Sequence, residues 1–270
     1  MRGASRASLA EARERLAAVL AGGADPGRLG DELFAVTGLL DAEAGLRRAL
    51  SDPTRGARAK AGLAQALLGD KIEPATMGLV TAVVGERWAE PADLTDATEE
   101  LAALAIIEVA DHAGKLDELE DELFRFGRVV NANPDLRYAL SNPFVPAEGK
   151  RRLLDSLLAG KVTGPTLRLV TQAAVQGRGR SLDASLDEYA RLAAERRERL
   201  VAEVHAAVAL TVTQRRRLAR ALAASYGRDV HLNVVLDPHV IGGMSVRIAD
   251  EIIDGSMASR LAELRRRLAG

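Results

Sequence analysis

One phrase occurs twice in this chain. Residues 46–53 read LRRALSDP, and residues 136–143 read LRYALSNP, 90 positions later. With the chain shifted by 90 residues, 21 of the 54 positions between 31 and 84 are identical to their counterparts. Six leucines recur at the helical spacing that a packed core requires: Leu33, Leu46, Leu50, Leu63, Leu67 and Leu79 recur as Leu123, Leu136, Leu140, Leu153, Leu157 and Leu169. A repeat of this length that occurs only twice predicts a duplicated all-helical bundle rather than a solenoid.

Turn residues divide each copy into five or six short helices. Ser51 and Ser141 are predicted to be turn or cap residues. Aromatic residues make up only 3% of the chain, so the cores must consist of Leu, Ala and Val, which favours helices. The predicted breaks are Gly22-Gly23, Asp52-Pro53, Gly69-Asp70 and Pro91, then Ala113-Gly114, Asn142-Pro143, Gly160 and Gly177–Gly179.

The segment 92–113 matches the end of one copy and also lies where the next copy begins. Its first half has one apolar stripe, and its second half, AALAIIEVA, is apolar on more than one face. A helix that is apolar on several sides is buried on several sides. We therefore predict one continuous helix, about 33 Å long at 1.5 Å per residue, that both bundles share. The alternative is two helices with a kink near Ala105.

The pattern changes after about residue 200. Alternating apolar residues predict strands at 200–210 and 229–236, and short strands at 244–248 and 251–254. Thr211 is predicted to cap a helix over 212–226, and residues 254–256 to cap a last helix. The expected fold class is mainly α with a small α+β C-terminal domain. The expected domains are a first bundle at 1–110, a second bundle at 92–199 that shares helix 92–113, and a β-α-β-β-α domain at 200–270, with both helices on one side of the sheet.

The tail HLNVVLDPHVIGGMSVRIADEIIDGSMASRLAELRRRL resembles the C-terminal signature of the delta subunit of F-type ATP synthases, the oligomycin-sensitivity-conferring protein family. The segments LAALAIIEVADHAGKLDELEDELFRF and NPDLRYALSNPFVPAEGKRRLLDSLL resemble the first four helices of that family. Residues 94–270 thus resemble a complete delta subunit. The additional bundle before them resembles the actinobacterial branch.

The resemblance implies a non-catalytic stator subunit of the peripheral stalk, which keeps the catalytic head from turning with the rotor. It implies that a helical bundle receives amphipathic helices from the alpha-subunit N-termini, with the beta subunits as further candidates. It also implies that the C-terminal domain holds the b subunit. Its implied place is the cytoplasmic face of the plasma membrane, within the complex. The alternative is a helical adaptor or scaffold unrelated to ATP synthase.

Bulk composition argues against other classes of function. The formal net charge is -1, so no overall field attracts nucleic acid or an anionic membrane. There is no cysteine, which excludes disulfides and thiolate metal sites. No apolar run approaches 18 residues, so no direct membrane span is expected. We expect no catalytic, cofactor-binding or metal-binding residues, and no cofactor.

Several residues could suggest a functional site, but a structural role explains each of them more simply. The pair Gly242-Gly243 precedes a strand and predicts a turn rather than a phosphate loop. The segment 177–180 is expected to be a solvated loop. The Arg clusters 196–197, 215–217 and 265–267 are not expected to bind nucleic acid, because the chain has no net basic charge. Trp88 and the two DELF segments are expected to pack in the core. The histidines His112, His205, His231 and His239 have no ligand spacing, and His205 and His231 are expected at surface positions on adjacent strands.

Overall fold

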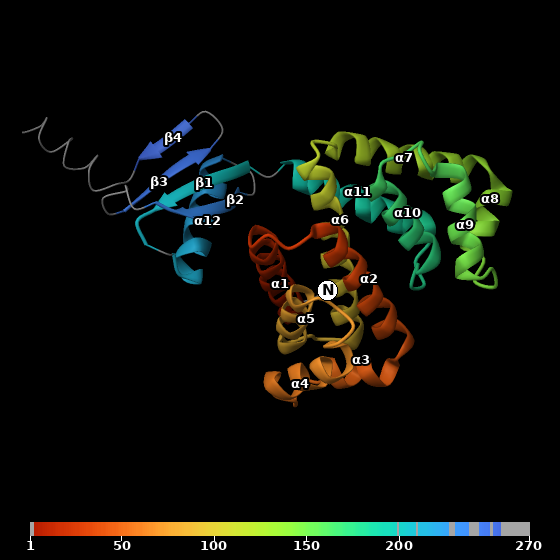
Figure 1. Ribbon diagram of the computed structural model, residues 1–270, viewed down its shortest axis with the longest axis horizontal. Helices are drawn as coiled ribbons and strands as arrows, with labels where there is room; N and C mark the ends of the chain where they lie inside the picture. The colour runs from red at the N-terminus through yellow and green to blue at the C-terminus, as the bar shows by residue number, and fades with distance from the viewer. Residues whose placement is uncertain are drawn as a thin grey trace, which may run out of the picture. The chain divides into compact units, whose positions relative to one another are not determined.

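The computed structural model describes residues 3–198, 200–208, 210–226, 230–237, 243–248 and 251–254 (Figure 1). Contacts divide the chain into two compact units, Met1–Ala194 and Glu195–Gly270. The first is helical and the second contains a sheet, as the predicted fold class requires. Within the first unit, the division into two overlapping bundles stays a prediction, and we name the bundles by their helices.

The first bundle comprises the helices α1 to α6. They are α1 (Gly3–Ala21), α2 (Pro26–Ala42), α3 (Ala44–Ser51), α4 (Ala57–Leu68), α5 (Pro74–Gly85) and α6 (Pro91–His112). The second bundle comprises α6 again and the five helices after it. These are α7 (Leu116–Ala132), α8 (Pro134–Ser141), α9 (Ala147–Leu158), α10 (Gly164–Val175) and α11 (Leu182–Glu198).

Four helices of the second bundle repeat those of the first with an offset of 90 residues. The helices α2 to α5 have 17, 8, 12 and 12 residues, and α7 to α10 have the same lengths. Equivalent polar side chains make equivalent bonds. The Glu32 carboxylate accepts from the Glu73 amide at 3.1 Å, and Glu122 accepts from the Thr163 amide at 3.0 Å. The repetition read in the sequence is therefore also a repetition of helix bounds and side-chain contacts.

Buried lysines provide a second equivalent contact. Lys60 Nζ donates to the Glu86 carbonyl at 2.8 Å, and Lys150 Nζ donates to the Ala174 carbonyl at 3.0 Å. Both carbonyls lie at the C-terminal end of a helix, where backbone acceptors lack intrahelical partners and a cation complements the dipole. Burial lowers the pKa of both lysines.

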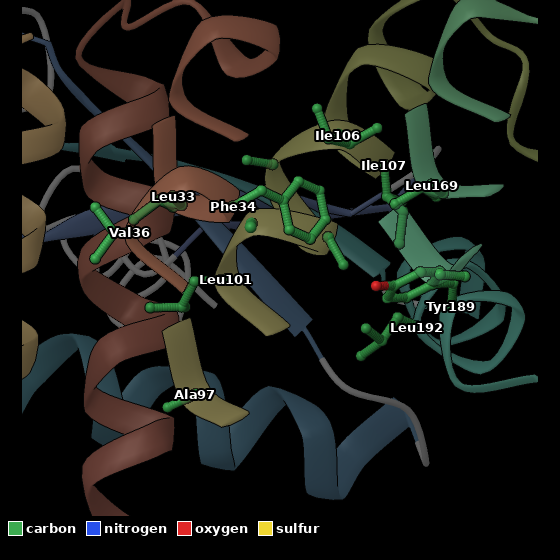
Figure 2. Close-up of a cluster of buried hydrophobic side chains, with 14 of the residues drawn as sticks. Leu33, Phe34, Val36, Ala97, Leu101, Ile106, Ile107, Leu169, Tyr189 and Leu192 are labelled. Carbon is green, nitrogen blue, oxygen red and sulfur yellow. The ribbon is translucent and has the colours of Figure 1, made fainter. Parts of the chain in front are cut away.

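The shared helix α6 is one unbroken helix from Pro91 to His112, which confirms the prediction of one continuous helix over the alternative of two helices. The Asp93 carboxylate anchors its start, because it accepts from the Glu90 amide at 3.3 Å and from Ser5 Oγ at 2.6 Å. Both halves of the helix are buried on several sides. The fully buried apolar residues of α6 are Leu94, Ala97, Leu101, Ala102, Ala103, Ala105, Ile106 and Ile107. All of them belong to one apolar cluster with residues from both bundles, and Figure 2 shows four of them, Ala97, Leu101, Ile106 and Ile107, within this cluster.

The predicted helix breaks are all present, but the predictions for Leu67 and Ser51 are wrong. Leu67 is exposed, although its recurrence suggested a core position. Ser51 is not a cap: it is the last residue of α3, and its hydroxyl donates back to the Arg47 carbonyl. The turns are instead made by the next residues, because Asp52 accepts from the Thr54 amide and Asn142 accepts from the Phe144 amide, each at 2.9 Å. Short acidic and amide side chains favour such turns.

The second unit contains a four-stranded sheet with the order β2-β1-β3-β4. Its elements are β1 (Leu200–Ala206), α12 (Val212–Tyr226), β2 (Val230–Leu236), β3 (Met244–Ile248) and β4 (Glu251–Asp254). β1 runs parallel to β2, and α12 crosses between them, while the other pairs are antiparallel. The core of this unit consists of Ala202, Val204, Leu222, Val246 and Ile248.

Most predicted bounds of this unit are confirmed. The first strand is shorter than expected, because it ends at Ala206 rather than at residue 210, and Val208 is exposed. Thr211 does cap α12, since its hydroxyl accepts from the Gln214 amide at 3.3 Å and Gln214 accepts from the Thr211 amide at 2.8 Å. The predicted last helix, and with it the expectation that both helices lie on one side of the sheet, falls outside the described residues.

Candidate functional site: the junction of the two bundles and the exposed aromatic side chains

A buried carboxylate is the centre of a charged cluster where the bundles meet. Glu99 of α6 is only 3% exposed and pairs with Arg178 at 2.5 Å and also with Arg180. Arg178, 8% exposed, also pairs with Asp96 at 2.6 Å. Tyr189 of α11 donates its hydroxyl to Glu99 at 3.1 Å. These contacts join α6, α11 and the segment between α10 and α11.

The charged side chains in this cluster are paired with side chains of opposite charge, as in a structural site. Burial, together with the neighbouring Glu99 carboxylate, raises the pKa of the Tyr189 phenol well above its usual value, so the phenol stays protonated and keeps donating. A buried charge is tolerated only when it is paired and hydrogen-bonded, and Glu99 meets both conditions. The arrangement therefore fixes positions between helices.

The segment 177–180 is not the solvated loop that we predicted. The Arg178 side chain points into the cluster, and its backbone adopts a left-handed conformation with φ 51°, which is uncommon for a residue other than glycine. Sequence reasoning also missed Glu99 and Asp96 as its partners. The signal was a glutamate on a helix otherwise apolar on several sides, since such a residue requires a buried cation.

Other singled-out residues have structural contacts. Trp88 is buried and donates Nε1 to the Val83 carbonyl at 3.0 Å, which confirms its packing role. His112 contacts Glu108 at 3.1 Å. His205 and His231 do lie on the adjacent strands β1 and β2, but His205 is half-buried and lies 3.5 Å from Asp237, so it is not a plain surface position. Among the residues that the structure describes, no group of three His, Asp or Glu side chains could hold a metal ion.

Aromatic side chains are exposed on the second bundle. Phe124 on α7 is 63% exposed, Tyr138 on α8 is 70% exposed, and Phe144, between α8 and α9, is 92% exposed. The prediction that both DELF segments pack in the core is therefore right for Phe34 and wrong for Phe124. Large exposed aromatic side chains are typical of surfaces that bind another protein.

Comparison with known proteins identifies the family of this chain. Residues 99–268 match the family described as "ATP synthase delta (OSCP) subunit". Proteins named "ATP synthase subunit delta" are similar over nearly the whole chain. The one from Streptomyces avermitilis is 52% identical over 99% of this chain and 98% of its own length. Those from Streptomyces griseus and Thermobifida fusca are 49% and 48% identical over the full length of both chains.

A family match that runs from α6 through the sheet, together with relatives similar over nearly the whole chain, identifies a non-catalytic structural subunit of a larger assembly. The chain belongs to the ATP synthase delta (OSCP) subunit family, and it is close to actinobacterial relatives over its full length. It is therefore a component of the peripheral stalk that links the catalytic head to the stator. The alternative of an adaptor unrelated to ATP synthase is excluded.

Proposed function

We propose that this chain holds the alpha subunits of the head through its helical bundles and the b subunit of the stalk through its C-terminal unit. The match of one family across residues 99–268, spanning both the second bundle and the sheet, is the observation that carries the proposal. A stator is under sustained torque, so its contacts must be extensive and must dissociate slowly. Amphipathic partner helices laid against helical surfaces suit that requirement.

The exposed aromatic side chains support a partner surface on the second bundle. Tyr138 and Phe144 have Arg48 and Thr54 at the positions 90 residues earlier, so the first bundle lacks the aromatic pair. Aromatic residues contribute a large share of binding energy at protein interfaces. We propose that Tyr138 and Phe144 contact the head.

The test is binding of the purified catalytic head to the chain with Tyr138→Ala and Phe144→Ala. We expect the dissociation constant to rise about tenfold or more, as at other aromatic hot spots. The matched control is Arg48→Ala with Thr54→Ala, which should change affinity little. Equal affinities for the two double variants and the original chain would contradict the assignment.

We further propose that the first bundle is a duplicate of the second and enlarges the contact with the head. Deleting residues 1–90 should weaken head binding while leaving b-subunit binding unchanged, because the C-terminal unit remains. Helix content measured by circular dichroism is the control for folding of the second bundle, since the deletion uncovers buried residues of α6 such as Ile106, and the b-subunit measurement controls for the C-terminal unit. Unchanged head affinity with intact b-subunit binding would rule out the larger contact.

Localisation follows from the complex rather than from the chain itself. Within the described ranges, no helix is both long and apolar enough to cross a membrane. We propose that the chain lies at the cytoplasmic face of the plasma membrane, held there peripherally by its partner subunits. Washing membranes with low-salt buffer, which releases peripheral assemblies, should release it together with the head.

A further inference from the structure

Helix α2 is buried on two sides. One side packs in the first bundle through Leu29, Leu33, Val36 and Leu40. The other side carries Gly27, Gly30 and Gly38, and it faces the second bundle. A Cβ added to Gly30 would lie 2.5 Å from Ile106 Cδ1 and 3.1 Å from the Ala102 carbonyl oxygen. Glycine is therefore required for α2 to approach α6 this closely.

The same side of α2 also reaches beyond the shared helix. A Cβ on Gly27 would lie 2.6 Å from Arg168 Nη1 of α10, and a Cβ on Gly38 would collide with the side chain of Gln176, the C-cap residue of α10. Both contacts are made to α10 and its C-cap residue, which belong only to the second bundle. They give the two bundles a second line of contact, away from the axis of α6.

An ion pair lies near each end of this line. Asp31 of α2 is 3.5 Å from Arg168, and Asp41 of α2 is 3.5 Å from Arg178. Arg178 is in turn held by Glu99 and Asp96 of α6. We call this set the α2 seam: Gly27, Gly30, Gly38, Asp31 and Asp41 on one side, and Arg168, Gln176 and Arg178 on the other.

The seam is not a general property of this kind of bundle. On α7, 90 residues later, the three glycines are replaced by Asp117, Glu120 and Arg128. These larger, charged side chains do not permit close helix approach, and the neighbouring Phe124 is exposed. The glycines are thus specific to the junction.

We propose that the α2 seam prevents the two bundles from turning about α6 and so makes them one rigid body. A single shared helix leaves rotation about its own axis as the softest motion between two bundles, and a packed contact away from that axis opposes it. In the context of the proposed stator function, this stiffness lets the chain transmit load without flexing.

The experiment measures the distance between the bundles in the isolated chain. Because the chain has no cysteine, Ala66→Cys on α4 and Ser156→Cys on α9 place two spin labels at exposed, equivalent positions without background. Pulsed dipolar spectroscopy should give one narrow distance distribution. Adding Gly38→Leu should broaden it about twofold or add a second distance, as a hinge opens. The matched control is Gly62→Leu, where a Cβ meets open space, and it should leave the distribution narrow.

A milder variant covers the case in which Gly38→Leu unfolds the first bundle. Asp31→Asn with Asp41→Asn changes two half-exposed carboxylates and should preserve helix content, yet still broaden the distribution, and high salt should do the same to the original chain. Distributions that stay as narrow as the Gly62→Leu control in every folded seam variant would overturn the proposal. The measurement involves no partner, so its failure is separate from failure of head or b-subunit binding.

Discussion

The first and second bundles have the same helix lengths but present different surfaces. Phe34 and Phe124 occupy equivalent positions in the two DELF segments, yet Phe34 is 7% exposed and Phe124 is 63% exposed. The neighbours decide the difference, because glycines beside Phe34 let α2 pack against the second bundle. Recurrence of a residue therefore predicts its helix position but not whether its side chain is covered.

The two repeat copies also differ in the residues at their C-terminal ends. Trp88 is buried in the first bundle, and the residue 90 positions later is Arg178, which enters the charged cluster around Glu99. Likewise Leu101 of α6 aligns with Tyr189 of α11 when DLTDATEELAALA (93–105) is set against SLDASLDEYARLA (181–193). Apolar side chains at the end of the first copy are thus replaced by polar side chains at the end of the second copy. These polar side chains form the charged cluster around Glu99.

Truncating the two equivalent phenylalanines is the sharpest test of this comparison. Phe34→Ala should lower the free energy of unfolding by about 3–5 kcal/mol, as for other buried aromatic residues. Phe124→Ala should change it by less than about 0.5 kcal/mol, as for exposed sites. Chemical denaturation of both variants measures the two values. Similar losses in the two variants would mean that the bundles do not differ in this way.

A proline in the shared helix should damage both bundles at once. Ala103 is fully buried in α6, and Ala103→Pro should cost about 3 kcal/mol or more by removing a helix hydrogen bond and adding a clash. Hydrogen exchange should rise in both α2 and α7. The control Ala66→Pro, in an exposed position of α4, should raise exchange in the first bundle alone. Protection of α7 that survives Ala103→Pro would count against a shared core.

The buried phenol of Tyr189 should make the free energy of unfolding depend on pH under alkaline conditions. The pKa of Tyr189 is raised in the folded protein, whereas in the unfolded chain it is about 10. Folding therefore benefits from the protonated phenol below pH 10 and loses that benefit as pH rises above 10 toward the folded pKa. Tyr189→Phe should flatten the decline in unfolding free energy above about pH 10, by up to about 1.4 kcal/mol per pH unit.

The matched control is Tyr138→Phe, which removes an exposed hydroxyl, and its free energy of unfolding should follow that of the original chain. If Tyr189→Phe and the original chain lose stability in parallel over the same range, the buried phenol has no linked role in folding.

Much of the fold was predictable because local signals agree with the final structure. Glycine, proline and Asp-Pro positions marked the helix ends, and the several-sided apolar pattern of 92–113 identified the shared helix. The strand 200–210 was predicted too long, because alternation continues through Val208 and Leu210 after pairing with β2 and β3 has ended. The alternation of apolar and polar residues indicates which face each side chain occupies, but it does not indicate where hydrogen bonding to the neighbouring strands ends.

The junction was much less predictable. The sequence placed Glu99 on the shared helix but could not show that Arg178, 79 residues later, would neutralise it. The role of the α2 glycines could not be predicted either. It depends on the close approach of Ile106, Arg168 and Gln176 from other parts of the chain. Contacts between distant segments decide such sites, and one sequence carries no direct record of them.

Restoring coupling to depleted membranes tests the central claim most directly. Inverted vesicles stripped of this subunit should hydrolyse ATP without pumping protons, because an untethered head turns with the rotor. Adding the purified chain should restore ATP-driven proton pumping, while the chain alone hydrolyses no ATP. Pumping that stays absent after the chain has been added, or ATP hydrolysis by the chain itself, would contradict the account.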